Sequence, residues 1–149
     1  MVTYESAAED PNTLSSKSIL KVFADSHERL WDISTCGLRY YDYHKNRFLA
    51  IENDITALSY CAVEESPRQI YMCIGDMLHT YDWLTNRLKP ILIHKREVRG
   101  RFTALAVDHR GNVWAGTKTG GLICMDHSHT SITRYRANRI CATGWHPIR

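Results

Sequence analysis

The densest group of side chains with metal-binding chemistry is the segment Cys124-Met-Asp-His127-Ser-His129. A thiolate and two imidazoles could share one Zn²⁺, which takes sulfur and nitrogen ligands. The sequence offers no obvious second ligand cluster, and Cys124 belongs to an expected strand while both histidines belong to an expected turn. We therefore expect no metal ion and no cofactor.

Two aspartates could form the carboxylate pair of a general acid–base catalyst. Asp25 and Asp108 each follow an apolar segment and open a polar one, a position where aspartate commonly caps a turn, and we favour that structural role. The glycines Gly116, Gly120 and Gly121 precede no expected helix, which a phosphate-binding loop requires. No Ser/His/Asp or Cys/His arrangement has the sequence context of a known hydrolase. The sequence predicts no catalytic residue.

Aromatic side chains offer a further kind of chemistry, because an exposed ring can stack on a sugar. Trp31, Tyr71 and Trp114 recur at one place in three repeated segments, so we expect them to pack between sheets instead. Trp83 and Trp145 do not follow the repeat. They are the candidates for a ligand-binding or interface residue.

Composition excludes several classes of protein. The hydrophobic fraction of 44% and charged fraction of 23% are typical of a soluble globular chain, and 149 residues suffice for one modest core. The net charge of +3 is too small to indicate nucleic acid or an anionic membrane as a partner. No segment approaches the roughly 20 apolar residues of a membrane span. The polar, acidic first ten residues do not form a signal peptide.

Cysteine usage is ambiguous about the redox compartment. The chain has five cysteines, an odd number, and no CxxC pair, which argues against a disulfide framework. Three of them fall in apolar runs, where we expect buried thiols. The five are Cys36, Cys61, Cys73, Cys124 and Cys141.

Three segments repeat one pattern, at residues 19–42, 55–82 and 102–126. Each has an apolar strand, an acidic turn, a strand centred on an aromatic residue, a further turn and a strand that closes on aspartate. The inner strands are expected at 19–25, 55–61 and 102–108. The central residues Trp31, Tyr71 and Trp114 are 40 and 43 residues apart. A period in the low forties built of short strands predicts four-stranded β-propeller blades, hence an all-β fold.

Turn residues support this interpretation. Asp108-His-Arg-Gly111 has the aspartate and glycine preferences of a type I turn, and Glu64-Glu65 is expected in a solvated turn. Short outer strands are expected near residues 47–50, 87–92 and 131–136. The repeat signature consists of Asp25, Trp31, Gly37, Tyr71, Gly75, Asp108, Gly111, Trp114, Gly116, Thr117, Gly120 and Gly121.

The repeats divide the chain into five segments. Residues 1–17 supply the outer strand of a preceding blade and a lead-in, residues 18–50, 51–93 and 94–137 form three blades, and residues 138–149 begin another. Three blades cannot close a ring, since propellers need about four or more. We expect either the remaining blades of a larger propeller or self-association through exposed blade edges.

The third repeat, residues 104–122, resembles the two-component regulator propeller repeat. It has an apolar strand, Asp108, Gly111, Trp114, and then a Gly-Thr and a Gly-Leu pair. The Leu-Ser-Ser before the first inner strand is similar to the family's lead-in. The first repeat has an extra residue after its tryptophan, and the second keeps Gly75 but lacks the tryptophan.

The resemblance implies the periplasmic sensor region of a hybrid histidine kinase. It implies ligand sensing, with an oligosaccharide as the ligand of the intact receptor, and no catalysis by this segment. Kinase motifs, a receiver aspartate site and a DNA-binding helix-turn-helix are absent from the sequence. Two alternatives stay open: a structural protein-interaction propeller, and a propeller enzyme similar to the streptogramin lyases.

Overall fold

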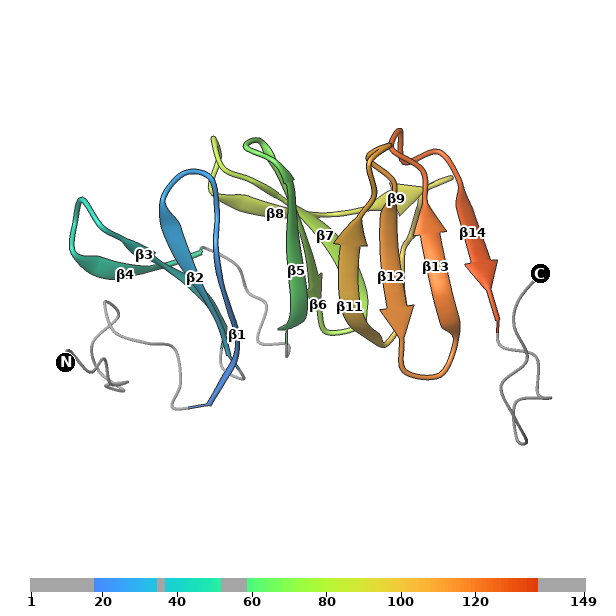
Figure 1. Cartoon of the computed structure of the whole chain (residues 1–149), viewed down its shortest axis with the longest axis horizontal. Helices are drawn as coiled ribbons and strands as arrows, with labels where there is room; N and C mark the ends of the chain where they lie inside the picture. Colours follow the sequence, from blue (N-terminus) through green and yellow to red (C-terminus); the bar gives the residue numbers. More distant parts are fainter. Residues whose placement is uncertain (1–17, 35–36, 52–58, 137–149) are drawn as a thin grey trace.

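The computed structural model describes residues 18–34, 37–51 and 59–136, and these form strands and turns without a helix. Three four-stranded antiparallel sheets lie side by side along the long axis of the molecule (Figure 1). In each sheet the spatial order of the strands is their order in the chain. The expected all-β fold is therefore confirmed.

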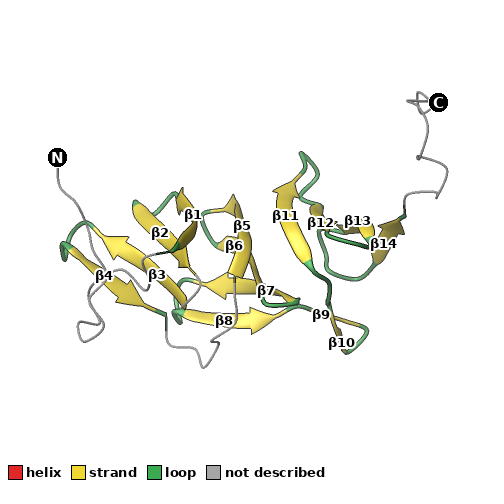
Figure 2. Ribbon diagram, turned by 90° about the horizontal axis from the view of Figure 1, so that it is seen from below, coloured by secondary structure: helices red, strands yellow, loops and turns green. Residues whose placement is uncertain are grey.

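The strands of the three sheets are short. Sheet 1 contains β1 (Ile19–Ala24), β2 (Arg29–Ser34), β3 (Gly37–Asp42) and β4 (Arg47–Ala50). Sheet 2 contains β5 (Ser59–Ser66), β6 (Gln69–Ile74), β7 (Met77–Asp82) and β8 (Arg87–Pro90). Sheet 3 contains β11 (Phe102–Val107), β12 (Val113–Thr117), β13 (Gly121–Met125) and β14 (Ile132–Tyr135). The small hairpin of β9 (Leu92–Ile93) and β10 (Arg96–Glu97) connects sheets 2 and 3 (Figure 2).

The inner strand of sheet 2 runs further than the sequence pattern predicts. We expected a turn after Cys61 with Glu64 and Glu65 in it, but β5 continues to Ser66 and pairs Glu64 with Ile70. That expectation is wrong: both glutamates have polar partners from the neighbouring sheets, Ser26 for Glu64 and His127 for Glu65, and are tolerated at the strand end. The first residues of the expected strand, 55–58, lie outside the described part of the chain.

The β9–β10 hairpin had no signal in the sequence. Its two turn residues, His94 and Lys95, both have positive φ, at 50° and 62°. Such a two-residue turn usually contains glycine or asparagine, and this one has neither. The hairpin and its flanks nonetheless deliver Ile91, Ile93 and Val98 to the core between sheets 2 and 3.

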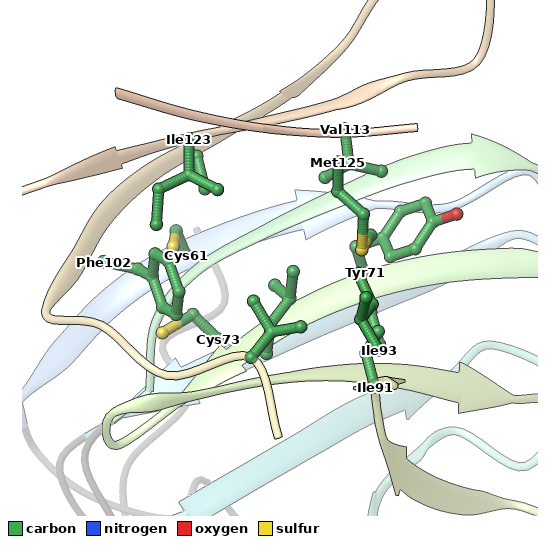
Figure 3. Packing of buried hydrophobic residues seen from close by; sticks show 12 residues of the cluster. Cys61, Tyr71, Cys73, Ile91, Ile93, Phe102, Val113, Ile123 and Met125 are labelled. Carbon is green, nitrogen blue, oxygen red and sulfur yellow. The ribbon is translucent and has the colours of Figure 1, made fainter. Parts of the chain in front are cut away.

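Two hydrophobic cores fill the spaces between neighbouring sheets. The core between sheets 1 and 2 contains the buried residues Trp31, Ile33, Ile51, Ala62, Ile70, Met72, Ile74 and Tyr81. The core between sheets 2 and 3, drawn in Figure 3, contains Cys61, Tyr71, Cys73, Leu78, Ile91, Ile93, Val98, Phe102, Val113, Ala115, Ile123 and Met125. Two of the three central aromatic residues therefore face the next sheet along the chain: Trp31 faces sheet 2 and Tyr71 faces sheet 3.

Glycine is required in the β12–β13 turn. Gly121 has φ 83°, and a Cβ there would lie 2.1 Å from the carbonyl oxygen of Tyr135. No other residue can be accommodated without moving β14. Gly116, by contrast, has room, because its Cβ would meet Thr103 and Ala104 at 3.6 and 3.7 Å.

Several expectations fall outside the described residues. These are the outer strand expected within residues 1–17, the start of another blade at residues 138–149, the Leu-Ser-Ser lead-in, Trp145, Cys36 and Cys141. The division of the chain into five segments stays a prediction.

Candidate functional site: the polar rim between the sheets

The turns β1–β2, β5–β6 and β11–β12 lie at one end of the sheets, at the top of Figure 1. We call this end the rim. There, polar side chains from adjacent sheets meet at a first junction, between sheets 1 and 2, and a second junction, between sheets 2 and 3.

An aspartate and a tryptophan six residues apart organise the rim in two of the sheets. The Trp31 indole Nε1 donates to Asp25 Oδ2 at 2.7 Å, and the Trp114 Nε1 donates to Asp108 Oδ2 at 3.0 Å. The other oxygen of each carboxylate caps its turn. Asp25 Oδ1 accepts hydrogen bonds from the backbone amides of His27 and Arg29. Asp108 Oδ1 accepts them from the backbone amides of Arg110 and Asn112. One side chain thus closes the turn and orients the indole.

The first junction holds a largely buried arginine among three aromatic rings. The Arg29 guanidinium carbon lies 5.1 Å from the ring centres of Trp31 and Tyr40 and 5.3 Å from that of Tyr81. Its Nη2 is 2.6 Å from Asp25 Oδ2, and its Nη1 donates to the Tyr81 hydroxyl at 3.1 Å. The Tyr81 ring meets Trp31 edge-on at 4.8 Å. The hydrogen bond and the cation–π contact of Arg29 with Tyr81 therefore join sheet 1 to sheet 2, while the ion pair with Asp25 fixes the guanidinium within sheet 1.

This arrangement sets two pKa values. Burial of Asp25 acts to raise its pKa, but hydrogen bonds from Trp31 and Arg29 outweigh it, and the pKa stays below its ordinary value. Burial raises the pKa of Tyr81 to about 12. The junction consequently carries a carboxylate, a guanidinium and a neutral phenol at neutral pH.

Further contacts at the first junction lie nearer to solvent. Ser26 donates from its amide and its hydroxyl to the Glu64 carboxylate, at 2.9 and 2.6 Å. The His27 ring lies 4.5 Å from the ring of Trp83, on the β7–β8 turn. Trp83 is 36% exposed, and its neighbour Leu84 is more so. Trp83, a ligand candidate from the sequence, thus sits beside the first junction with part of its indole accessible.

The second junction uses a glutamate where the other sheets use aspartate. Glu65 lies six residues before Tyr71, and its Oε1 is 3.3 Å from His127 Nδ1. The Tyr71 hydroxyl and His129 Nε2 share a 2.7 Å hydrogen bond. Burial, with the nearby Glu65 charge, raises the pKa of Tyr71 to about 12, and burial lowers the pKa of His129. The φ of 78° favours glycine at position 111, and a Cβ there would also displace the exposed His127 ring, whose Nδ1 would lie 2.7 Å away.

The cluster at Cys124, His127 and His129 is not brought together as a metal site. Cys124 lies on β13 opposite Trp114, whereas the two imidazoles face Glu65 and Tyr71 of sheet 2. In the described ranges, no group of three or more histidine, cysteine, aspartate or glutamate side chains could hold a metal ion. The two aspartates Asp25 and Asp108 belong to different sheets, and each is engaged in its own turn.

Comparison with solved structures decides what these sheets are. They are blades of a β-propeller. The chain is similar to the extracellular domain of a hybrid two-component system of B. thetaiotaomicron, with 18% identity and a TM-score of 0.71, over 86% of this chain and 17% of that one. A second such extracellular domain from the same organism gives 20% identity and a TM-score of 0.68, over 89% of this chain and 18% of that one.

A propeller enzyme also has this fold. Virginiamycin B lyase from Staphylococcus aureus gives 10% identity and a TM-score of 0.61, over 80% of this chain and 41% of that one. At these identities the comparisons establish the fold alone. The chain spans less than a fifth of the length of each of these extracellular domains. No family model and no curated protein matches the sequence.

The part of the chain that the structure describes contains no helix long and apolar enough to cross a membrane.

Sequence reasoning missed Arg29, Glu65 and Tyr81 as rim residues. One signal was available for Glu65, which stands as far before Tyr71 as Asp25 stands before Trp31. Arg29 and Tyr81 gave none, because their contact crosses from one blade to the next.

Proposed function

We propose that this chain is a ligand-sensing, non-catalytic blade segment of an extracytoplasmic two-component sensor. The observation that carries the proposal is the match of its three consecutive blades to extracellular domains of hybrid two-component systems, over 86% and 89% of the chain. The periplasmic location is part of the proposal, as are transmission of the signal to a histidine kinase and the oligosaccharide nature of the ligand.

The first junction is the best candidate ligand contact in this segment. Trp83 presents an accessible indole, which suits stacking on a sugar ring, and the His27 contact restricts its position. Hydrogen-bonding groups of Ser26 and Glu64 lie on the same rim. An aromatic face beside polar groups is the combination that a neutral oligosaccharide requires.

The test is a glycan array probed with the whole chain, followed by titration of any retained oligosaccharide. Trp83→Ala should weaken binding about tenfold, which corresponds to a loss of roughly 1.4 kcal/mol of binding free energy. Leu84→Ala, which removes an exposed neighbour without touching the indole, should leave binding unchanged. An array with no retained glycan, or equal binding by wild type and Trp83→Ala, would refute this ligand assignment.

We propose as partner a further propeller blade, docked on the outward face of sheet 3. On this face the Trp114 ring stacks with Tyr135 at 5.8 Å, and Leu122 and Tyr135 are 40% and 51% exposed. The corresponding faces of sheets 1 and 2, centred on Trp31 and Tyr71, are buried under the next blade. If every central aromatic face is covered by the next blade, the Trp114 face is covered by a blade as well.

A lyase is the second candidate, because virginiamycin B lyase shares the fold. Such an enzyme needs a proton-transferring pair free to reach its substrate. In this segment Asp25 and Asp108 accept hydrogen bonds from their own blade, and Glu64 accepts them from the preceding blade. Incubation with virginiamycin B, followed by mass spectrometry for ring opening, should show no turnover, and turnover would replace the sensor proposal with the lyase.

A further inference from the structure

Two cysteines face each other across the inner hairpin of sheet 2. Cys61 on β5 and Cys73 on β6 are direct register partners in an antiparallel pair. Residues directly opposite in such a pair have Cα atoms about 4.5–5.5 Å apart, inside the roughly 4.4–6.8 Å span that a disulfide requires. Being opposite, they also project from the same face of the sheet.

The two thiols share one apolar environment. Cys61 is 2% exposed and Cys73 is fully buried, and both belong to the core between sheets 2 and 3. Figure 3 shows their sulfur atoms beside the ring of Phe102, which comes from sheet 3. Cys73 also donates to the carbonyl of Gly75 at 3.6 Å.

Metal binding does not explain this pair. Zn²⁺ needs about four donors from cysteine, histidine or carboxylate side chains. The neighbours of the pair in the core include Phe102 and Leu78, which supply none. The described chain has no group of three candidate ligands at this position.

We propose that Cys61 and Cys73 form a cross-strand disulfide when the chain folds in the presence of a disulfide oxidant, such as glutathione disulfide or a dithiol–disulfide oxidase. The Cys61 thiolate attacks the oxidant, forms a mixed disulfide and expels one thiolate. Cys73 then loses its proton and attacks the Cys61 sulfur, which releases the second thiolate. Two protein thiols lose two electrons and two protons, and one disulfide becomes two thiols.

In the folded chain, the local charges favour Cys61 over Cys73 as the attacking thiol. A hydrogen bond between the thiols, with the positive charge of Lys21, lowers the pKa of Cys61 despite its burial. The same hydrogen bond, together with burial, raises the pKa of Cys73. Lys21 is held in place by donation from its Nζ to the carbonyl of Ala62 at 2.8 Å.

Burial determines when the disulfide can form. In the folded chain sheet 3 covers both sulfurs, so an oxidant has little access to them. In a refolding chain the β5–β6 hairpin is local, with 11 residues between the two cysteines, and it can pair before sheet 3 packs on it. We therefore expect rapid oxidation during refolding and slow oxidation of the folded, reduced chain.

The experiment is refolding of the whole chain in a glutathione redox buffer, alkylation of remaining thiols, and tryptic mapping without reduction. Cleavage after Arg47, Arg68 and Arg87 places Cys61 in peptide 48–68 and Cys73 in peptide 69–87. The five cysteines fall in five different tryptic peptides, so each pairing has its own mass. The expected product is the linked pair 48–68/69–87, which disappears on reduction.

Cys124→Ala is the matched control, because Cys124 faces Trp114 and Thr133 and no cysteine. It should leave the linked pair intact, whereas Cys61→Ser and Cys73→Ser should each abolish it. Oxidised wild type should melt several degrees above the reduced form, and Cys124→Ala should keep that difference. Absence of the 48–68/69–87 product after refolding, or its occurrence no more often than links to Cys124, would overturn the proposal.

Discussion

Replacement of Asp25 by asparagine is the sharpest test of how the first junction holds two blades together. In the wild type, Asp25 Oδ2 accepts from the Trp31 indole and from Arg29 Nε, both at 2.7 Å. Asparagine can keep Oδ1 on the two backbone amides of the turn, but it then points an NH₂ group at both of these donors. The variant therefore leaves the Arg29 charge buried and unpaired.

The expected loss is large for one isosteric change. Removal of one partner from a buried ion pair costs about 3–5 kcal/mol, and the Asp25 and Arg29 side chains are 0% and 12% exposed. For a chain of this size, 1 kcal/mol of stability is worth about 2–4 °C in the melting temperature. The melting temperature of Asp25→Asn should thus fall by roughly 6–20 °C.

Two comparisons test whether the loss of stability comes from the ion pair. Circular dichroism would monitor both thermal and urea unfolding. Asp108→Asn changes the equivalent residue of sheet 3, whose Oδ2 faces Trp114 and a neutral Asn112 amide, and it should cost clearly less. The double variant Asp25→Asn/Arg29→Met should be more stable than the sum of the single losses predicts, because it removes the unpaired charge. Equal losses at Asp25 and Asp108, or strict additivity, would show that the ion pair is not the cause.

The same carboxylate contributes to the pH dependence of stability. The pKa of Asp25 is lowered in the folded state, so the unfolded chain binds more protons as pH falls. Its contribution is complete above the unfolded pKa of about 3.9 and is lost as pH falls through the folded value. In Asp25→Asn, the acid limb of the stability curve should be shallower than in wild type, and an unchanged limb contradicts the assignment.

The remaining predictions concern sheet 3. Gly121→Ala should destabilise the chain by about 1–2 kcal/mol because of its positive φ alone, and by more because of the clash with the carbonyl of β14. Gly116→Ala should have an unfolding midpoint close to that of wild type. Equal unfolding midpoints for the two variants would contradict this account of the turn. In sedimentation experiments, the mass of the wild type should rise with protein concentration, because the Trp114 face binds a second copy of the chain. Leu122→Asp should shift this equilibrium toward monomer. Leu92→Asp, which changes an exposed residue on β9, should leave the equilibrium unchanged. A wild type that is monomeric at every concentration would refute self-association through this face.

Much of the fold was predictable from local pattern. Strand alternation, turn residues and the recurrence of Trp31, Tyr71 and Trp114 are properties of neighbouring residues, and they predict three four-stranded sheets. The prediction was wrong at β5, where Glu64 and Glu65 extend the strand. A polar pair reads as a turn in isolation, and only the donors supplied by adjacent blades make a strand acceptable there.

The sequence by itself determined the repeat, the aromatic centre of each blade and the aspartate that caps the first turn in two of the three blades, because each of these depends on residues within one hairpin. Only the tertiary structure decided which side chains meet between blades. Arg29 reaches Tyr81 52 positions away, and Tyr71 reaches His129 58 positions away. The sequence likewise did not show that Cys61 lies opposite Cys73, because this position depends on strand register. A shift of one residue would turn every side chain of the strand to the other face.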